Sequence, residues 1–149
     1  MDQTELKRTA ATHMLHALGP MAASIERSLA ERTGYRLVDG EALRIIESGG
    51  PMRMTDLAAR LIISKAGGTK VADRLEARGL VRRTQDAGDR RSYLLEVTES
   101  GREALARIRP VVDEAIERMW SRHLASHEAE TLLSVADRLI DANPDWHPR

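Results

Sequence analysis

The sequence predicts a mostly α-helical fold that carries a small antiparallel β-hairpin near its middle. Three observations favour this class. Apolar residues recur every three or four positions near both ends of the 149-residue chain, which is typical of amphipathic helices. Between them lie two short runs of alternating polarity, 80–85 and 91–97, which are typical of strands. Aromatic residues make up 3% of the chain and Phe is absent, so the core must consist of Leu, Ile, Val, Ala and Met.

The N-terminal part predicts one long helix followed by a short one. The long helix is expected over residues 4–32, and Gly34 ends it. Its Gly19-Pro20 pair predicts a kink or a break, because proline lacks the N–H that helix interiors need. Asp39 is then expected to cap a second helix over residues 41–48. A Gly-Gly-Pro run stops that helix.

The central part has the order helix, tight turn, helix, hairpin. Thr55 is expected to cap a helix over 56–61, and Ser64 one over 65–78. A short edge strand at 52–54 precedes them, and an Asp/Gly turn at 86–89 joins the two later strands. This order predicts a winged helix-turn-helix, in which one helix enters the DNA major groove beside a β-wing.

The C-terminal part returns to helices. Thr98 should cap a long helix over 99–124, bent at Pro110, and Ser126 should start a final helix that Asn143-Pro144 ends. The expected organisation is one structural unit. It consists of an N-terminal dimerisation helix (1–34), a winged helix-turn-helix lobe (35–98) and C-terminal dimerisation helices (99–149).

Charge is distributed unevenly along a neutral chain. The stretch 53–93 contains ten Lys and Arg against five Asp and Glu, whereas the whole chain has 23 of each sign. The window is therefore +5 and the remainder −5, which predicts a polyanionic partner for the lobe. The absence of cysteine excludes disulfides, thiolate metal sites and thiol switches.

The helical regions on either side of the lobe, 1–34 and 99–149, contain more apolar residues than they would need if they only packed against the lobe. Their apolar residues could pack together within one chain as an ordinary monomer core. The pattern favours a two-fold dimer interface, because paired lobes about one DNA turn (~34 Å) apart read a palindrome.

These features resemble the MarR (multiple antibiotic resistance regulator) family of bacterial transcription factors. The motifs are DLAARL at 56–61, SKAGGTKVADRLEARGLV at 64–81, the Asp/Arg wing at 86–91 and LLEVTESG at 94–101. The resemblance implies an obligate homodimer that binds an operator palindrome, usually to repress nearby genes. It also implies a small-molecule pocket between the dimer helices and the lobe.

The helix over 65–78 is the candidate reading helix, with its first turns toward the bases. Arg74 and Arg78 are open to two roles, a phosphate contact or pairing with Asp73 and Glu76. The adjacent glycines either bring backbone close to DNA or form a loosely wound turn. The predicted DNA-contacting residues are Ser64, Lys65, Gly67, Gly68, Thr69, Lys70, Arg74, Arg83, Arg90 and Arg91.

In the wing, Asp89 is predicted to be a structural partner rather than a DNA contact. The family often has a basic residue where this chain has Gly88, so Arg90 would have to enter the minor groove instead. Of Arg82 and Arg83, alternation along a strand allows only one to face DNA.

An effector pocket, implied by the resemblance alone, would involve residues of the outer helices and of the 41–48 helix. The candidates are Met14, Leu18, Met21, Tyr35, Ile45 and Ile116, although plain core packing is favoured for each of them singly.

Other function classes have weaker support. His13 and His16 have a metal-compatible spacing, which leaves a zinc-responsive regulator open, but scattered surface histidines are favoured and no metal site or cofactor is predicted. No nucleophile–base pair or phosphate-binding loop is present, so an enzyme is not expected. A winged-helix protein-interaction module remains an alternative. No apolar run could span a membrane, and a cytoplasmic protein is expected.

Overall fold

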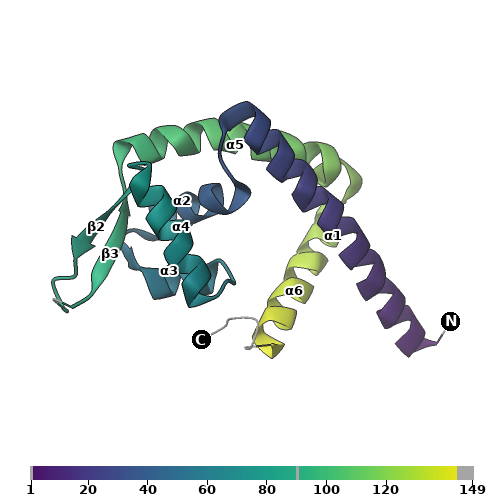
Figure 1. The fold of residues 1–149 in the computed structure, drawn as a ribbon. Coiled ribbons are helices and arrows are strands. Elements are labelled where there is room, and N and C mark those ends of the chain that lie inside the picture. Colours follow the sequence, from purple (N-terminus) through teal and green to yellow (C-terminus); the bar gives the residue numbers. More distant parts are fainter. Residues whose placement is uncertain (1, 90, 144–149) are drawn as a thin grey trace.

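A computed structural model describes residues 2–89 and 91–143, and within them the chain is mostly helical with a small antiparallel sheet, as predicted (Figure 1). The elements are α1 (Gln3–Thr33), α2 (Leu37–Gly49), β1 (Met52–Arg53), α3 (Met54–Arg60), α4 (Lys65–Ala77), β2 (Val81–Gln85), β3 (Tyr93–Val97), α5 (Glu99–Met119), the 3₁₀ turn η1 (Ser121–His123) and α6 (Ser126–Ala142).

The lobe consists of α2, α3, α4 and the sheet, which lie beside the first part of α5 (Figure 1). The strand order is β1-β3-β2, with Val81 opposite Val97 and Met52 opposite Leu95. The short edge strand expected at 52–54 is therefore present as β1. Fully buried leucines from α1, α2, α3, α4 and β3 fill the centre of the lobe.

The expected interruption at Gly19-Pro20 is wrong as a break, because α1 is continuous from Gln3 to Thr33. The residue before a proline is normally pushed out of the helical region by a clash with its Cβ. Gly19 has no Cβ, which removes that clash, and α1 passes through Pro20. Gly34 ends α1 in the left-handed region at φ 71°, as predicted.

Two of the expected helix caps are wrong. Asp39 is not the cap of α2, because that helix begins earlier, at Leu37. The Leu37 N–H instead donates to Glu26 Oε2 of α1 at 2.7 Å. Thr55 lies inside α3, which begins at Met54. Ser126 is the first residue of α6, as predicted, and Ala125 precedes it as the cap.

Two predicted caps are confirmed at the helices that flank the wing. Ser64 Oγ accepts a hydrogen bond from the Gly67 N–H at 3.0 Å and starts α4. Thr98 Oγ1 accepts one from the Gly101 N–H at 3.1 Å and starts α5. These caps satisfy helix N–H groups that otherwise lack partners.

The N-terminal part of α1 and the far end of α5 extend away from the lobe, and α6 runs back down from the end of α5 (Figure 1). α5 ends at Met119 rather than near residue 124, and η1 follows it. No residue of α6 is buried. Asn143 follows α6, whereas the predicted stop at Pro144 lies outside the described residues. Within residues 2–89 and 91–143, no helix has both the length and the apolar character needed to cross a membrane.

Candidate nucleic-acid interface

The N-terminal turns of α4 present exposed polar groups. Lys65 and Lys70 are both exposed, and Ser64 lies at the surface beside them. Thr69 is half-buried, and its hydroxyl donates to the Lys65 carbonyl at 3.0 Å, which leaves its oxygen lone pairs available as acceptors. The positive end of the helix dipole adds to the lysine charges at this surface.

The two glycines of α4 lie in different surroundings. Gly68 is buried against α3, and a Cβ placed there would lie 2.6 Å from the Ala58 Cβ. Gly68 is therefore a close-packing residue between two helices, whereas its contact with DNA stays a prediction. A Cβ at Gly67 would meet Ser64 Oγ at 3.2 Å, so this position is tight but lies nearer the surface.

Arg74 is held by a buried carboxylate on α2. Its Nε donates to Asp39 Oδ1 at 3.0 Å and to Oδ2 at 3.2 Å, and its Nη2 also donates to Oδ1. Asp39 is fully buried, whereas the Arg74 side chain is 30% exposed. The hydrogen bonds from Arg74 to Asp39 raise the pKa of the guanidinium above its usual value, so it stays charged. The expected alternative partners, Asp73 and Glu76, are wrong for this residue.

Asp73 and Glu76 instead pair with Arg83 of β2. The Arg83 Nη2 lies 2.5 Å from Asp73 Oδ1, and its Nη1 lies 2.8 Å from Glu76 Oε2. Arg82, the next residue along the strand, pairs with Glu96 of β3 at 2.9 Å. The alternation predicted for these two arginines is thus present, and the guanidinium of Arg83 ties the wing to α4.

The wing is braced from its base by Arg53. Its Nη2 lies 2.9 Å from Asp86 Oδ2 and 3.9 Å from Asp89 Oδ2. Asp89 also accepts hydrogen bonds from the Arg91 N–H at 3.0 Å and the Ser92 hydroxyl at 2.7 Å. Asp89 therefore acts inside the wing. Sequence reasoning missed Arg53, because no local pattern links a residue of β1 to carboxylates 33 or more positions later.

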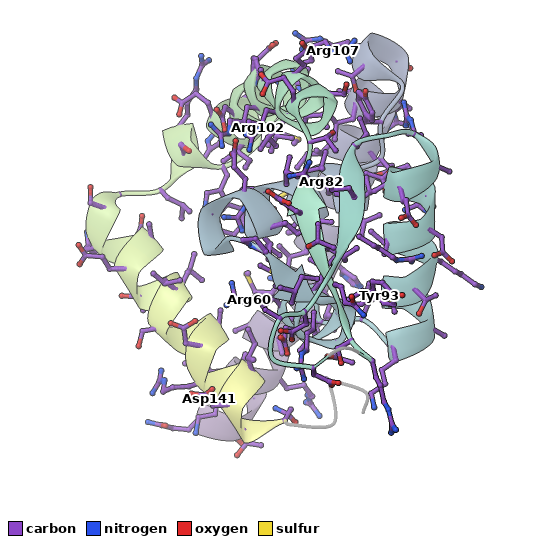
Figure 2. The ribbon with its side chains drawn as sticks, turned by 90° about the vertical axis from the view of Figure 1, so that its left-hand side faces the viewer. Arg60, Arg82, Tyr93, Arg102, Arg107 and Asp141 are labelled. Carbon is purple, nitrogen blue, oxygen red and sulfur yellow. The ribbon has the colours of Figure 1, made fainter. Side chains whose placement is uncertain are left out.

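Five described basic residues of the 53–93 window form no ion pair with a described carboxylate. One of them, Arg78, is instead held by the Tyr35 ring and the Gly34 carbonyl. The other four, here called the unpaired cations, are Arg60, Lys65, Lys70 and Arg91. Two of them lie on α4, one on α3 and one in the wing. Figure 2 shows Arg60 and Tyr93 toward one end of the lobe, whereas Arg107 lies on α5 at the other end. Arg90, predicted to enter the minor groove, lies outside the described residues.

The six candidate pocket residues differ in exposure. Tyr35 is 5% exposed and its ring lies under the Arg78 guanidinium, 4.0 Å from the ring centroid. Its hydroxyl accepts a hydrogen bond from Arg107 Nη2 at 3.1 Å. Ile45 is buried in the core, whereas Leu18 and Ile116 are 43% and 39% exposed. Met14 and Met21 are half-buried on α1.

A separate hollow of about 80 Å³ lies between α2 and α5 and contains none of the six. Apolar and charged side chains line it together: Leu37, Glu41, Arg44, Leu105, Ile108, Arg109, Val112 and Asp113, with Gly40. As for metals, no group of three or more His, Asp or Glu side chains suited to a metal ion occurs in residues 2–89 and 91–143.

Comparison with known proteins finds a family match for the lobe. The sequence model of the MarR family matches residues 37–93, which include α2, α3, α4 and the first strand of the wing. The transcriptional repressor MprA of Escherichia coli (strain K12) is 31% identical over 86 residues, covering 58% of this chain and 48% of MprA. The chain thus spans about half the length of the first curated relatives that it matches.

Two solved structures share the fold over almost the whole chain. AbsC, a MarR family transcriptional regulator from Streptomyces coelicolor, has a TM-score of 0.85 at 25% identity and covers 97% of each chain. Sco3205 from the same organism, solved with DNA, has a TM-score of 0.86 at 22% identity and covers 95% of this chain and 92% of its own. The expectation of a non-enzyme agrees with the names of these proteins. In its motifs and its fold the chain is therefore similar to proteins of the MarR family, whose sequence model matches its residues 37–93.

Proposed function

We propose that this chain is a DNA-binding transcriptional regulator that acts as a homodimer on a palindromic operator. The observation that carries the proposal is the position of the unpaired cations. Lys65 and Lys70 lie on α4, whose capped N-terminus faces solvent, and Arg91 lies in the adjoining wing. Cations without carboxylate partners can neutralise phosphates without first breaking an ion pair.

The contacts divide into two kinds. Lys65 and Thr69 are assigned to base edges, because a lysine donates to guanine O6 and N7 and a threonine contacts thymine through its methyl group. Ser64, Lys70 and Arg91 are assigned to phosphates, which fix register without reading sequence. Arg74 and Arg83 are removed from the contact set because carboxylates hold both guanidinium groups.

The homodimer is supported by apolar side chains that one chain leaves exposed. Leu15 on α1 is 73% exposed, and Leu133 and Leu139 on α6 are 65% and 50% exposed. A monomer core would bury these residues, so packing within one chain does not account for them. A second copy would cover the exposed parts of α1 and α6, here called the arms, and would place two α4 helices on one duplex.

Regulation is the remaining part of the proposal. The match to the MarR family model, together with the likeness to MprA, which is named a transcriptional repressor, supports repression of nearby genes and release by a small molecule. Such a role belongs in the cytoplasm. A reporter placed under the upstream DNA of the gene should be expressed less when the chain is present. A rise in expression would contradict repression.

The test of DNA binding uses a duplex recovered from a random-sequence pool by selection on the wild-type chain. Affinity should fall steeply with salt, with a log–log slope of about −0.9 for each phosphate neutralised. Lys65→Ala and Lys70→Ala should each weaken binding. Where the lost side chain contacts a phosphate, the log–log slope should also become less steep by about 0.9. Arg82→Ala is the matched control, because Arg82 is paired with Glu96 on β3.

Failure to recover any duplex at low salt would sink the proposal and favour the protein-interaction alternative. Equal losses for Arg82→Ala and Lys65→Ala would show that general positive charge, rather than this face of α4, binds DNA. Circular dichroism on each variant confirms that the helices remain folded.

A further inference from the structure

The ion pair between Asp39 and Arg74 joins two helices with different roles. Asp39 lies in the first turn of α2, and Arg74 lies near the end of α4. Within the described residues, Asp39 is the only buried charged side chain, and it is 0% exposed. Its hydrogen-bond partner is the guanidinium of Arg74, which approaches with two nitrogen atoms.

Stability alone does not explain such a pair. A buried ion pair loses so much hydration that well-packed apolar residues in its place are often neutral or stabilising. Apolar contacts do not fix the relative orientation of two helices, because apolar side chains pack acceptably at several rotations and offsets of one helix against the other. A guanidinium that meets a carboxylate with two nitrogens accepts a narrow range of orientations.

The helix that carries Asp39 is itself fixed to the rest of the protein. A Cβ at Gly40 would lie 2.7 Å from Ile108 Cγ2, so α2 and α5 touch closely one residue after Asp39. On α4, the buried residues near Arg74 are the small or aliphatic Val71, Ala72 and Leu75. The ion pair is therefore a directional link between α4 and α2, the helix that packs closely on α5.

We propose that Asp39 and Arg74 are positioning residues that set the angle at which α4 meets the major groove. The inference rests on the proposed DNA binding and goes beyond it. Arg74 does not touch phosphate, and its effect on binding passes through Asp39. Loss of the Asp39 carboxylate should therefore weaken DNA binding. Simple electrostatics predicts the opposite change in affinity, since removing a negative charge should strengthen binding to a polyanion.

The test compares two duplexes by fluorescence anisotropy, one selected on the wild-type chain and one of random sequence and equal length. Asp39→Asn should weaken binding to the selected duplex at least tenfold and leave the random duplex unchanged or bound more tightly. Arg74→Lys keeps the charge but loses the two-nitrogen contact, and it should behave in the same way. Glu41→Gln is the matched control, because it removes a carboxylate from the exposed Glu41–Arg44 pair on the same helix.

A double variant, Asp39→Leu with Arg74→Met, keeps the test valid if Asp39→Asn fails to fold. It replaces the pair with apolar side chains and should fold, yet lose the preference for the selected duplex. Its loss should be no larger than that of either single variant, because both residues act through one contact.

Three outcomes would overturn the inference. One is equal or tighter binding of the selected duplex by Asp39→Asn, and another is full binding by Arg74→Lys. The third is an equal loss on both duplexes. A wild-type chain that binds neither duplex would instead refute the proposed function itself, before any variant is compared.

Discussion

At the scale of single residues, the arginines of the lobe are distinguished by what they face rather than by their position in the chain. Arg74 and Arg83 lie within ten positions of each other and were both expected at DNA, but both are held by carboxylates. Exposed ion pairs contribute little to stability, typically about 0–1 kcal/mol. Their main consequence here is to leave a small set of lysines and arginines available to an anion.

The contacts that hold Asp86 and Asp89 in the wing predict that both carboxyl groups have a pKa below the usual range. The hydrogen bond from Arg53 lowers the pKa of Asp86, with a further contribution from the Gly88 N–H. The Ser92 hydroxyl and the Arg91 N–H lower the pKa of Asp89. A carboxyl whose pKa is lower in the folded state stabilises that state above its unfolded pKa, about 3.9, and loses the effect as pH falls through the folded value.

The wing should therefore stay braced at neutral pH and loosen only below about pH 3.9. The measurement is a ¹³C NMR titration of the Asp86 carboxyl carbon, whose midpoint should lie below that value. Arg53→Gln should raise the midpoint, because it removes the hydrogen-bond donor that lowers the pKa of Asp86 most. A wild-type midpoint at or above the usual value would show that the brace does not form in solution.

The backbone conformation of Ile62 predicts that glycine is more stable than alanine at this position. It lies in the turn between α3 and α4 with φ 55°, a left-handed conformation that is unfavourable for a β-branched residue. Ile62→Gly and Ile62→Ala remove the same packing beyond Cβ, but only glycine relieves the backbone strain. The glycine variant should be the more stable of the two by about 1 kcal/mol in urea unfolding.

The control for Ile62 is the same exchange in an ordinary helix. Ala106 is exposed in the middle of α5, where Ala→Gly should cost about 1 kcal/mol. The two sites should therefore rank glycine and alanine in opposite orders. An identical ranking at both would mean that the turn is not strained.

At the scale of elements, the sequence predicted features whose partners are close along the chain. Ser64 and Thr98 bond to N–H groups three residues later, so their capping roles follow from a short motif. Asp39 has the same chemistry, but its partner Arg74 is 35 positions away. A local rule therefore assigned Asp39 to a cap, when the tertiary fold buries it. Glu26, which bonds to the start of α2 from α1, was missed for the same reason.

The candidate site was predictable to a similar extent. The order of elements identified α4 as the exposed helix beside the wing, and Lys65 and Lys70 lie on its surface. Gly68 was not recognisable as a packing residue, because the space available to a Cβ depends on Ala58 of the neighbouring helix. Spacing within one helix does not reveal how closely a second helix approaches.

The contact between α3 and α4 gives a prediction that separates packing from DNA approach. Gly68→Ala forces a Cβ against Ala58 and should destabilise the fold by about 1–3 kcal/mol, the usual cost of overpacking. Adding Ala58→Gly opens the space again. In a double-mutant cycle by thermal unfolding, the pair should therefore show a favourable coupling of about 1 kcal/mol or more.

The opposite pattern would identify a different role for Gly68. A variant that unfolds like the wild type but binds DNA poorly would mean that the glycine admits backbone to the duplex. Gly67→Ala is a useful comparison, because its Cβ would meet only Ser64 Oγ at 3.2 Å and Ile63 atoms at 3.6 Å.

At the scale of the whole molecule, the lobe is well packed and the arms are not. Ile25 and Leu29 at the end of α1 are buried, whereas Leu6, Leu15 and Leu18 earlier in the same helix are exposed. Fully burying a leucine typically contributes about 1.5–3 kcal/mol. The described arms therefore expose enough apolar surface for a second copy to stabilise both chains.

The last prediction tests this interface directly. The double variant Leu133→Glu, Leu139→Glu places charges on the exposed apolar part of α6 and should separate the dimer, because an unpaired carboxylate is costly to bury. Sedimentation equilibrium should give about twice the 16.6 kDa chain mass for the wild type and a single chain mass for the variant. Ser134→Glu, an exposed polar position on the same helix, should remain dimeric. The lobe does not use α6 for its core, so the separated chain should keep its helical circular dichroism while losing affinity for a palindromic duplex. A wild-type chain that sediments at 16.6 kDa at micromolar concentration would show that α1 and α6 are not a dimer interface.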